Sequence, residues 1–155
     1  MAAPKPPPLS ASDWRLAVWR TYLRTNDAVM RSLERDLIDG ADLPLAWYDV
    51  LLQLAEAPQR RLRMAELADS VLLSRSGLTR LVDRLVSAGL VSREPFPGDA
   101  RGSYTVLEPA GLARLRAAAP IHLAGIGSHW LSKYSDEELL LLGRLLERLE
   151  ADGGD

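Results

Sequence analysis

Arginine and hydroxyl side chains are concentrated between Ser74 and Arg84, and they are well suited to binding another molecule. The apolar residues of this stretch recur every three or four positions, as on a helix, so the polar residues share the outward face. A guanidinium can pair in bidentate fashion with guanine, and a serine or threonine hydroxyl can bond to a base or a phosphate. The stretch therefore predicts nucleic-acid contacts from Ser74, Arg75, Ser76, Thr79, Arg80 and Arg84.

A second candidate contact is the Asp99-x-Arg101 pair, which lies in a turn-rich stretch at 95–102. Strands are expected on either side, at 90–94 and 103–107, so this stretch would form the loop of a hairpin. An arginine at such a tip can enter the minor groove of duplex DNA, where the potential is most negative. We expect Arg101 to make that contact, while Asp99 holds it or stiffens the loop. The alternative is a surface hairpin whose loop carries an ordinary ion pair.

A helix-turn-helix unit is predicted to position the first set of residues. Helices are expected at 64–71 and 75–88, with Ser74 as the cap of the second helix and Gly89 as its left-handed end. Together with the hairpin, this unit would make a winged helix. The alternative is a pair of amphipathic helices with a solvated polar face, which also contains Asp83.

The remaining segments are predicted to be mostly helical, which makes the fold class mainly α with a small β-hairpin wing. Ser10 or Ser12 is expected to cap the first helix, and Gly40 and Pro44 to end it. A last helix starts at the Ser-x-x-Glu capping box of Ser135. The helices are expected at about 14–38, 45–57, 109–134 with a bend at Pro120, and 135–150, with a short extended piece at 61–63.

The terminal helices, rich in leucine and tryptophan, carry more apolar surface than one small lobe can cover. A two-fold dimer would bury it. We therefore divide the chain into a disordered Pro-rich arm at 1–10, a winged helix-turn-helix lobe at 43–108, and a helical dimerisation region formed by 11–42 and 109–151.

Composition excludes several classes of protein. The 155 residues include no cysteine, which rules out disulfide frameworks, thiolate metal sites and cysteine nucleophiles. No apolar run reaches the ~18 residues of a membrane span, and the N-terminus lacks a signal-peptide layout, so a cytoplasmic location is expected. The net charge is −2, but Arg60 to Arg101 contains eight basic and five acidic residues. A basic centre between acidic ends fits a DNA-binding lobe with a separate assembly region.

These motifs resemble those of MarR-type winged-helix transcription regulators. The resemblance covers roughly Trp14 to Glu150. It implies an obligate homodimer whose first and last helices interlock and whose two lobes read a palindrome. It also implies base contacts from the polar face described above, with Arg84 nearer the phosphates and Arg101 in the minor groove. The strongest matches are MAELA at 64–68, SRSGLTRLVDRL at 74–85, GLV at 89–91, and DARG at 99–102 followed by Leu107 and Ala110-Gly111.

An aromatic group near the expected junction of dimer and lobe is a candidate ligand pocket. Proteins that this chain resembles often bind small aromatic or anionic molecules there and then lose DNA affinity. The alternative is that these side chains belong to the core and the dimer interface. The residues are Trp14, Trp19, Tyr22, Trp47 and Tyr48.

Metal and enzyme chemistry have little support in the sequence. His122 and His129 are the only histidines, and seven helical residues separate them by about 10 Å, too far to share a metal. No nucleophile elbow or Gly-rich phosphate loop is present. We expect no enzyme activity, no cofactor and no metal.

The sequence therefore predicts a homodimeric regulator, most often a repressor, that binds a palindromic operator in double-stranded DNA and is released by a small ligand. The alternative is a winged-helix module that binds a protein partner and does not read DNA. Steep salt dependence and a recovered DNA motif would distinguish the first from the second.

Overall fold

The computed structural model describes residues 8–71 and 75–151, without the side chains of 75, 76, 99–101, 150 and 151. Most of the predicted Pro-rich arm and Ser74 lie outside the described residues. The helices are α1 (Arg15–Ala41), α2 (Leu45–Glu56), η1 (Pro58–Arg60), α3 (Met64–Ser70), α4 (Arg75–Ser87), α5 (Pro109–His129), η2 (Leu131–Lys133) and α6 (Asp136–Ala151), and the strands are β1 (Arg61–Arg63), β2 (Val91–Phe96) and β3 (Asp99–Leu107).

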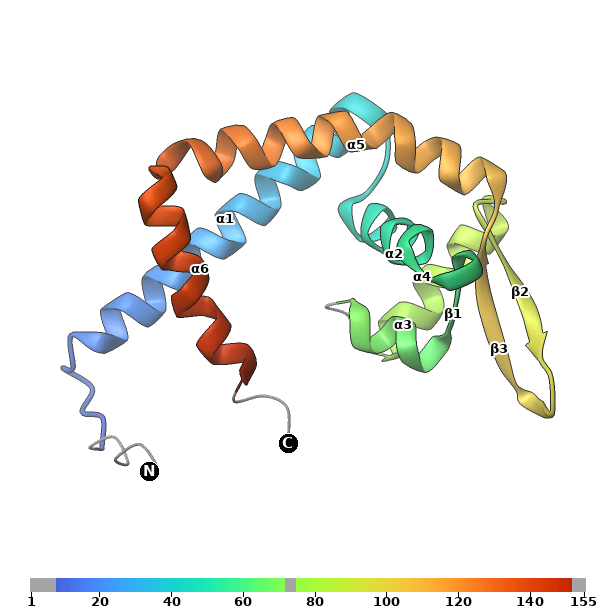
Figure 1. Cartoon of the computed structure of the whole chain (residues 1–155), viewed down its shortest axis with the longest axis horizontal. Coiled ribbons are helices and arrows are strands. Elements are labelled where there is room, and N and C mark those ends of the chain that lie inside the picture. Colours follow the sequence, from blue (N-terminus) through green and yellow to red (C-terminus); the bar gives the residue numbers. More distant parts are fainter. Residues whose placement is uncertain (1–7, 72–74, 152–155) are drawn as a thin grey trace.

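The elements divide into a winged lobe and an extended helical part (Figure 1). The lobe contains α2, α3, α4 and the three strands, and the long helix α5 leads from it across the molecule to α6. Helix α1 runs on the same side as α6, and both ends of the described chain lie away from the wing. The predicted fold class, mainly helical with a small wing, is confirmed.

One hydrophobic core holds the lobe together. It combines apolar residues of α2, α3, α4 and the sheet with Leu37 from the end of α1 and with Leu115 and Ala118 from α5. Because α1 and α5 contribute to this core, the lobe is anchored to the helical part by packing as well as by the chain.

Helices α1 and α5 approach each other closely through two glycines. A Cβ at Gly40 would lie 2.8 Å from Cδ1 of Ile121, and one at Gly125 would lie 2.8 Å from Cδ2 of Leu33. Gly40 is therefore a packing residue inside α1, and its expected role in ending the helix is wrong. The left-handed residue at that end is Asp42, with φ 49°.

Two long side chains fix the junction between α1 and α2. Glu34 Oε2 accepts a hydrogen bond from the backbone nitrogen of Leu45 at 2.6 Å, at the first turn of α2. Arg114 Nη2 on α5 donates to the carbonyl oxygen of Asp42 at 2.7 Å, where α1 ends. These bonds satisfy polar groups that a helix end leaves without a partner inside the helix.

The start of α1 differs from the prediction. Its N-cap is Trp14 rather than Ser10 or Ser12, and no side chain caps it. Asp13 Oδ1 accepts instead from the backbone nitrogen of Arg15 at 2.9 Å. The hydrogen bonds from Arg15 lower the pKa of the Asp13 carboxyl to about 2.

The end of α5 also differs from the prediction. Helix α5 runs through Pro120 and ends at His129, because Trp130 leaves helical geometry at φ −127° and ψ −62°. The short 3-10 helix η2 follows, so the helix does not continue to Tyr134 as expected.

The sheet contains one strand more than the predicted hairpin, in the order β1-β3-β2, with both pairs antiparallel. Strands β2 and β3 are also longer than expected and take up most of the predicted loop. Pro95 lies in β2, which is an edge strand, and edge strands are where a sheet accommodates proline.

Candidate nucleic-acid interface

Helix α4 carries the predicted contact residues on one face and core residues on the other. Leu78, Val82 and Leu85 are fully buried. Thr79, Arg80 and Arg84 are exposed, as the helical spacing predicts. Arg75 and Ser76 lie in the first turn of α4, but their side chains are outside the description, and Ser74 is outside the described residues. Packing of the buried face in the core fixes the orientation of α4, and so the direction in which its polar face points.

The acidic residue on this face is paired within the lobe. Asp83 Oδ1 on α4 accepts from Arg93 Nη2 on β2 at 2.7 Å. This ion pair compensates the Asp83 charge, and it joins the exposed face of α4 to the wing. The sequence placed Asp83 correctly on the outward face but did not identify Arg93 as its partner.

The wing places Asp99 and Arg101 on a strand, which corrects the predicted loop. The turn consists of Pro97 and Gly98, and Gly98 has the positive φ of 91° that this tight turn requires. Asp99 begins β3 and Arg101 follows two residues later, close to the turn. Their side chains are outside the description.

A group of cationic and aromatic side chains on the wing was missed from the sequence. Arg61 Cζ lies 4.6 Å from the ring centroid of Tyr104, and Arg63 Cζ lies 3.7 Å from that of Phe96. The rings of Phe96 and Tyr104 are 5.3 Å apart. The alternation Arg61-Leu62-Arg63 was the available signal, since alternate residues of a strand share one face.

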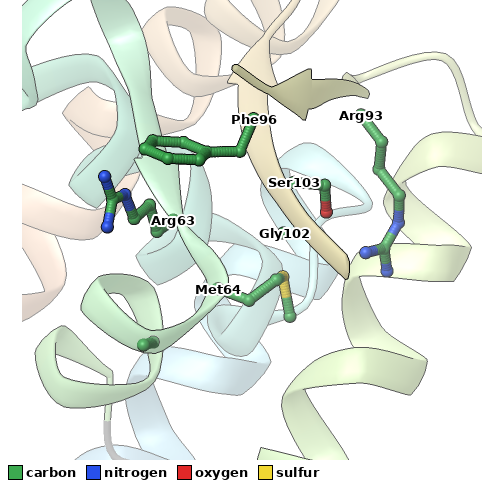
Figure 2. A pocket seen from close by; sticks show the side chains of 7 residues that line it. Arg63, Met64, Arg93, Phe96, Gly102 and Ser103 are labelled. Atoms are coloured by element: carbon green, nitrogen blue, oxygen red, sulfur yellow. The ribbon is translucent and has the colours of Figure 1, made fainter. Parts of the chain in front are cut away.

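An open crevice of about 320 Å³ lies between the start of α3 and the wing. Figure 2 shows the ring of Phe96 directed toward Arg63 on one side, Arg93 on the other, and Met64 and Ser103 between them. A smaller hollow of about 180 Å³ adjoins it and reaches α4 at Leu78 and Thr79. The surface is therefore hollowed all the way from α4 to the wing. The lining of the larger crevice is Arg63, Met64, Ala65, Arg93, Phe96, Gly102 and Ser103.

The five aromatic residues predicted for a ligand pocket lie in two separate places. Trp14, Trp19 and Tyr22 are exposed near the start of α1, with Trp19 and Tyr22 stacked at 5.8 Å. Trp47 and Tyr48 lie on α2, which follows the other end of α1. Since α1 has 27 residues, about 40 Å separates its two ends. A single chain does not bring the five side chains together.

The two histidines have different environments. His129 Nε2 and Asp36 Oδ2 are 2.7 Å apart, which links α5 to α1. His122 lies against Tyr48 at 4.4 Å, and its Nδ1 has no hydrogen-bond partner among the described residues. Burial lowers the pKa of His122, and the nearby Asp49 carboxylate partly opposes this. No cluster of three metal-ligating residues occurs in the described part of the chain.

Within the described ranges, no helix combines the length and apolarity needed to cross a bilayer. The long helices α1 and α5 instead carry polar and glycine positions that pack against each other.

Comparison with known proteins identifies this architecture. A family model described as MarR family matches residues 41–102. The HTH-type transcriptional repressor YetL of Bacillus subtilis is 35% identical over 114 residues, which are 71% of this chain and 68% of that protein. Sco3205, a MarR family transcriptional regulator from Streptomyces coelicolor solved in complex with DNA, is 35% identical with a TM-score of 0.84, covering 97% of this chain and 92% of that one.

A mutant of MarR from E. coli, complexed with operator DNA, superposes with a TM-score of 0.79 at 25% identity. That match covers 91% of this chain and 99% of the other. The family model covers most of the lobe, whereas the two structural matches extend over most of the whole chain. The chain belongs to the MarR family of transcriptional regulators, which are not enzymes.

Proposed function

We propose that this protein is a homodimeric repressor that binds a palindromic operator in double-stranded DNA. The observation that carries the proposal is the exposed face of α4, where Thr79, Arg80 and Arg84 stand out from a fully packed lobe. A recognition helix of this kind enters the major groove with its N-terminal half. Arg101 on β3 would enter the neighbouring minor groove.

The homodimer is supported by uncovered apolar side chains on the terminal helices. Trp14, the N-cap of α1, is 74% exposed, and on α6 Leu140 and Leu149 are each 67% exposed. Large apolar surfaces of this kind mark interaction sites. A second copy provides the same surface in return, and its two-fold axis would place two α4 helices about 34 Å apart, one turn of DNA.

A repressor role and ligand release complete the proposal. YetL, 35% identical, is named a repressor. A small aromatic or anionic molecule bound beside the exposed, stacked rings of Trp19 and Tyr22 on α1 would change the spacing of the two lobes and so the DNA affinity. A protein that acts on an operator is expected in the cytoplasm.

The decisive experiment is selection of binding sites from random duplex DNA by the purified protein, followed by affinity at several salt concentrations. We expect a palindromic site and an affinity that falls steeply with salt. If no motif is recovered and binding is weak at ~150 mM salt, the proposal fails and a protein-binding role takes its place.

Recovery of a site would allow the ligand part to be tested separately. Aromatic carboxylic acids and neutral aromatic compounds would be titrated into the protein–DNA complex. Release of the DNA by one class supports ligand control, and the Trp19→Ala variant should then lose that response while still binding DNA. A complex unaffected by both classes contradicts release by such ligands.

A further inference from the structure

The outer part of the wing lacks a third strand. Strand β1 pairs with β3 only from Arg61 to Arg63, and its last residue faces Tyr104. Beyond this point β2 and β3 continue as a two-stranded ribbon to the turn, as Figure 1 shows. An isolated two-stranded ribbon is marginally stable in water, so its angle to the lobe needs support from side chains.

Phe96 provides such a support. The register of β2 and β3 shifts between Pro95 and Phe96. Irregularities of this type redirect a side chain. The Phe96 ring, at the end of β2, is directed back toward Arg63, whose Cζ lies 3.7 Å from the ring centroid (Figure 2). The outermost residue of β2 is thus tied to the last residue of β1.

Arg63 is itself fixed to the lobe. Its backbone nitrogen donates to Glu66 Oε2 at 2.7 Å in the first turn of α3. Helix α3 is in turn held by Leu67, which is fully buried in the core. The contact with Phe96 therefore connects the ribbon to an element that cannot move independently of α4.

A second pair supports the base of the same face. Arg61 lies over Tyr104 and forms an ion pair with Glu94 Oε2 at 3.4 Å. Tyr104 contacts Phe96, so the side chains form a continuous row across all three strands. Guanidinium groups are attracted to aromatic faces by the ring quadrupole, which gives this row a preferred geometry.

We propose that Arg63 and Phe96 are positioning residues that set the angle of the wing and thereby bring Arg101 to the DNA. The inference rests on the proposed DNA binding. Phe96 carries no charge and need not touch DNA for this role. It acts by holding the ribbon in place. Replacing Phe96 should therefore change DNA affinity in the same way as replacing Arg101.

The test compares Phe96→Leu, Arg101→Ala and the double variant on the selected operator at several salt concentrations. We expect each single variant to lose affinity about tenfold, and each to reduce the slope of log affinity against log salt by about 1. The double variant should also lose about tenfold, because Phe96 acts through Arg101. Thermal unfolding checks that each variant remains folded.

Two variants of Arg63 test its part in the proposal, and one variant of Arg116 is the matched control. Arg63 is exposed, so Arg63→Gln should leave the lobe folded and behave like Phe96→Leu. Arg63→Lys keeps a cation over the ring and should restore most of the affinity. Arg116→Gln removes one exposed charge from α5 and should leave both the affinity and the salt slope close to the original values.

The inference is overturned if Phe96→Leu retains the original salt slope, or if the losses of the two single variants multiply in the double variant. Failure of the proposed function would be seen earlier and differently. In that case the unaltered protein would select no operator, and the wing would have no DNA contact to position. If the unaltered protein selects an operator and the Phe96→Leu variant binds it with the same affinity, only the positioning role of Phe96 is contradicted.

Discussion

The winged lobe and the terminal helices have the same leucine-rich helical spacing, but only the lobe covers its own apolar faces. Leu54 on α2 and Leu85 on α4 are fully buried, whereas Leu140 and Leu149 on α6 are each 67% exposed. The spacing of apolar residues therefore predicts that a face will be buried. It does not say whether the same chain or a second copy buries it.

The largest effect is expected from a change that breaks the terminal helices and spares the lobe. Leu141→Glu combined with Leu145→Glu places two charges on the exposed stripe of α6. We expect a monomer by sedimentation velocity and a loss of DNA affinity of about 100-fold or more, because the two lobes no longer bind together.

The matched control for that variant is Leu141→Met with Leu145→Met. It retains apolar side chains of similar volume and should remain dimeric. A glutamate variant that stays dimeric and binds the operator normally would show that α6 lies outside the dimer interface.

The comparison is sharpened by removing one leucine from each region. Leu54→Ala should lower the free energy of unfolding by about 2–5 kcal/mol, because it leaves a cavity in the core of the lobe. It should leave the monomer–dimer dissociation constant unchanged. Leu149→Ala should raise the monomer–dimer dissociation constant and leave the free energy of unfolding of the lobe almost unchanged. Urea denaturation and sedimentation measure the two quantities, and equal effects from both substitutions would contradict the division.

Elements with a strong helical period could be predicted well from the sequence. The buried and exposed faces of α4 follow from spacing alone, and Gly89 has the expected positive φ of 70° after this helix. Boundaries that depend on tertiary contacts were less accessible. Gly40 looked like a helix end because glycine favours ends, yet the close approach of Ile121 is what requires it.

Replacement of Arg80 tests the DNA-binding side of the lobe directly. Arg80→Ala should cost about 1–3 kcal/mol in operator binding and relax the base preference at one position of each half-site. Arg35→Ala, which removes an exposed charge from α1, serves as the control. Fluorescence anisotropy with operator variants measures both effects. If affinity and preference are retained, Arg80 makes no base contact.

The candidate site could be predicted only where it depends on one helix. Thr79, Arg80 and Arg84 share a face through their spacing along α4. The contacts of Arg63 with Phe96 and of Arg93 with Asp83 join residues that are 33 and 10 positions apart. The contact of Phe96 depends on the register of the sheet and its irregularity after Pro95, and that of Asp83 depends on the packing of β2 against α4. Hydrophobic periodicity specifies neither of them.

The smallest effect concerns the contact between the lobe and α5. Burial lowers the pKa of His122, so the unfolded chain takes up a proton first as the pH falls below about 6.5. The neutral His122 side chain therefore contributes to the free energy of unfolding at pH values above about 6.5. This contribution is lost as the pH falls toward the lower pKa that His122 has in the folded protein. Solvent screening keeps this contribution below about 1 kcal/mol.

We expect urea denaturation to show a smaller loss of stability between about pH 7.5 and about pH 5.5 in His122→Gln than in the unaltered protein. An identical pH dependence would mean that His122 is as well solvated in the folded lobe as in the unfolded chain.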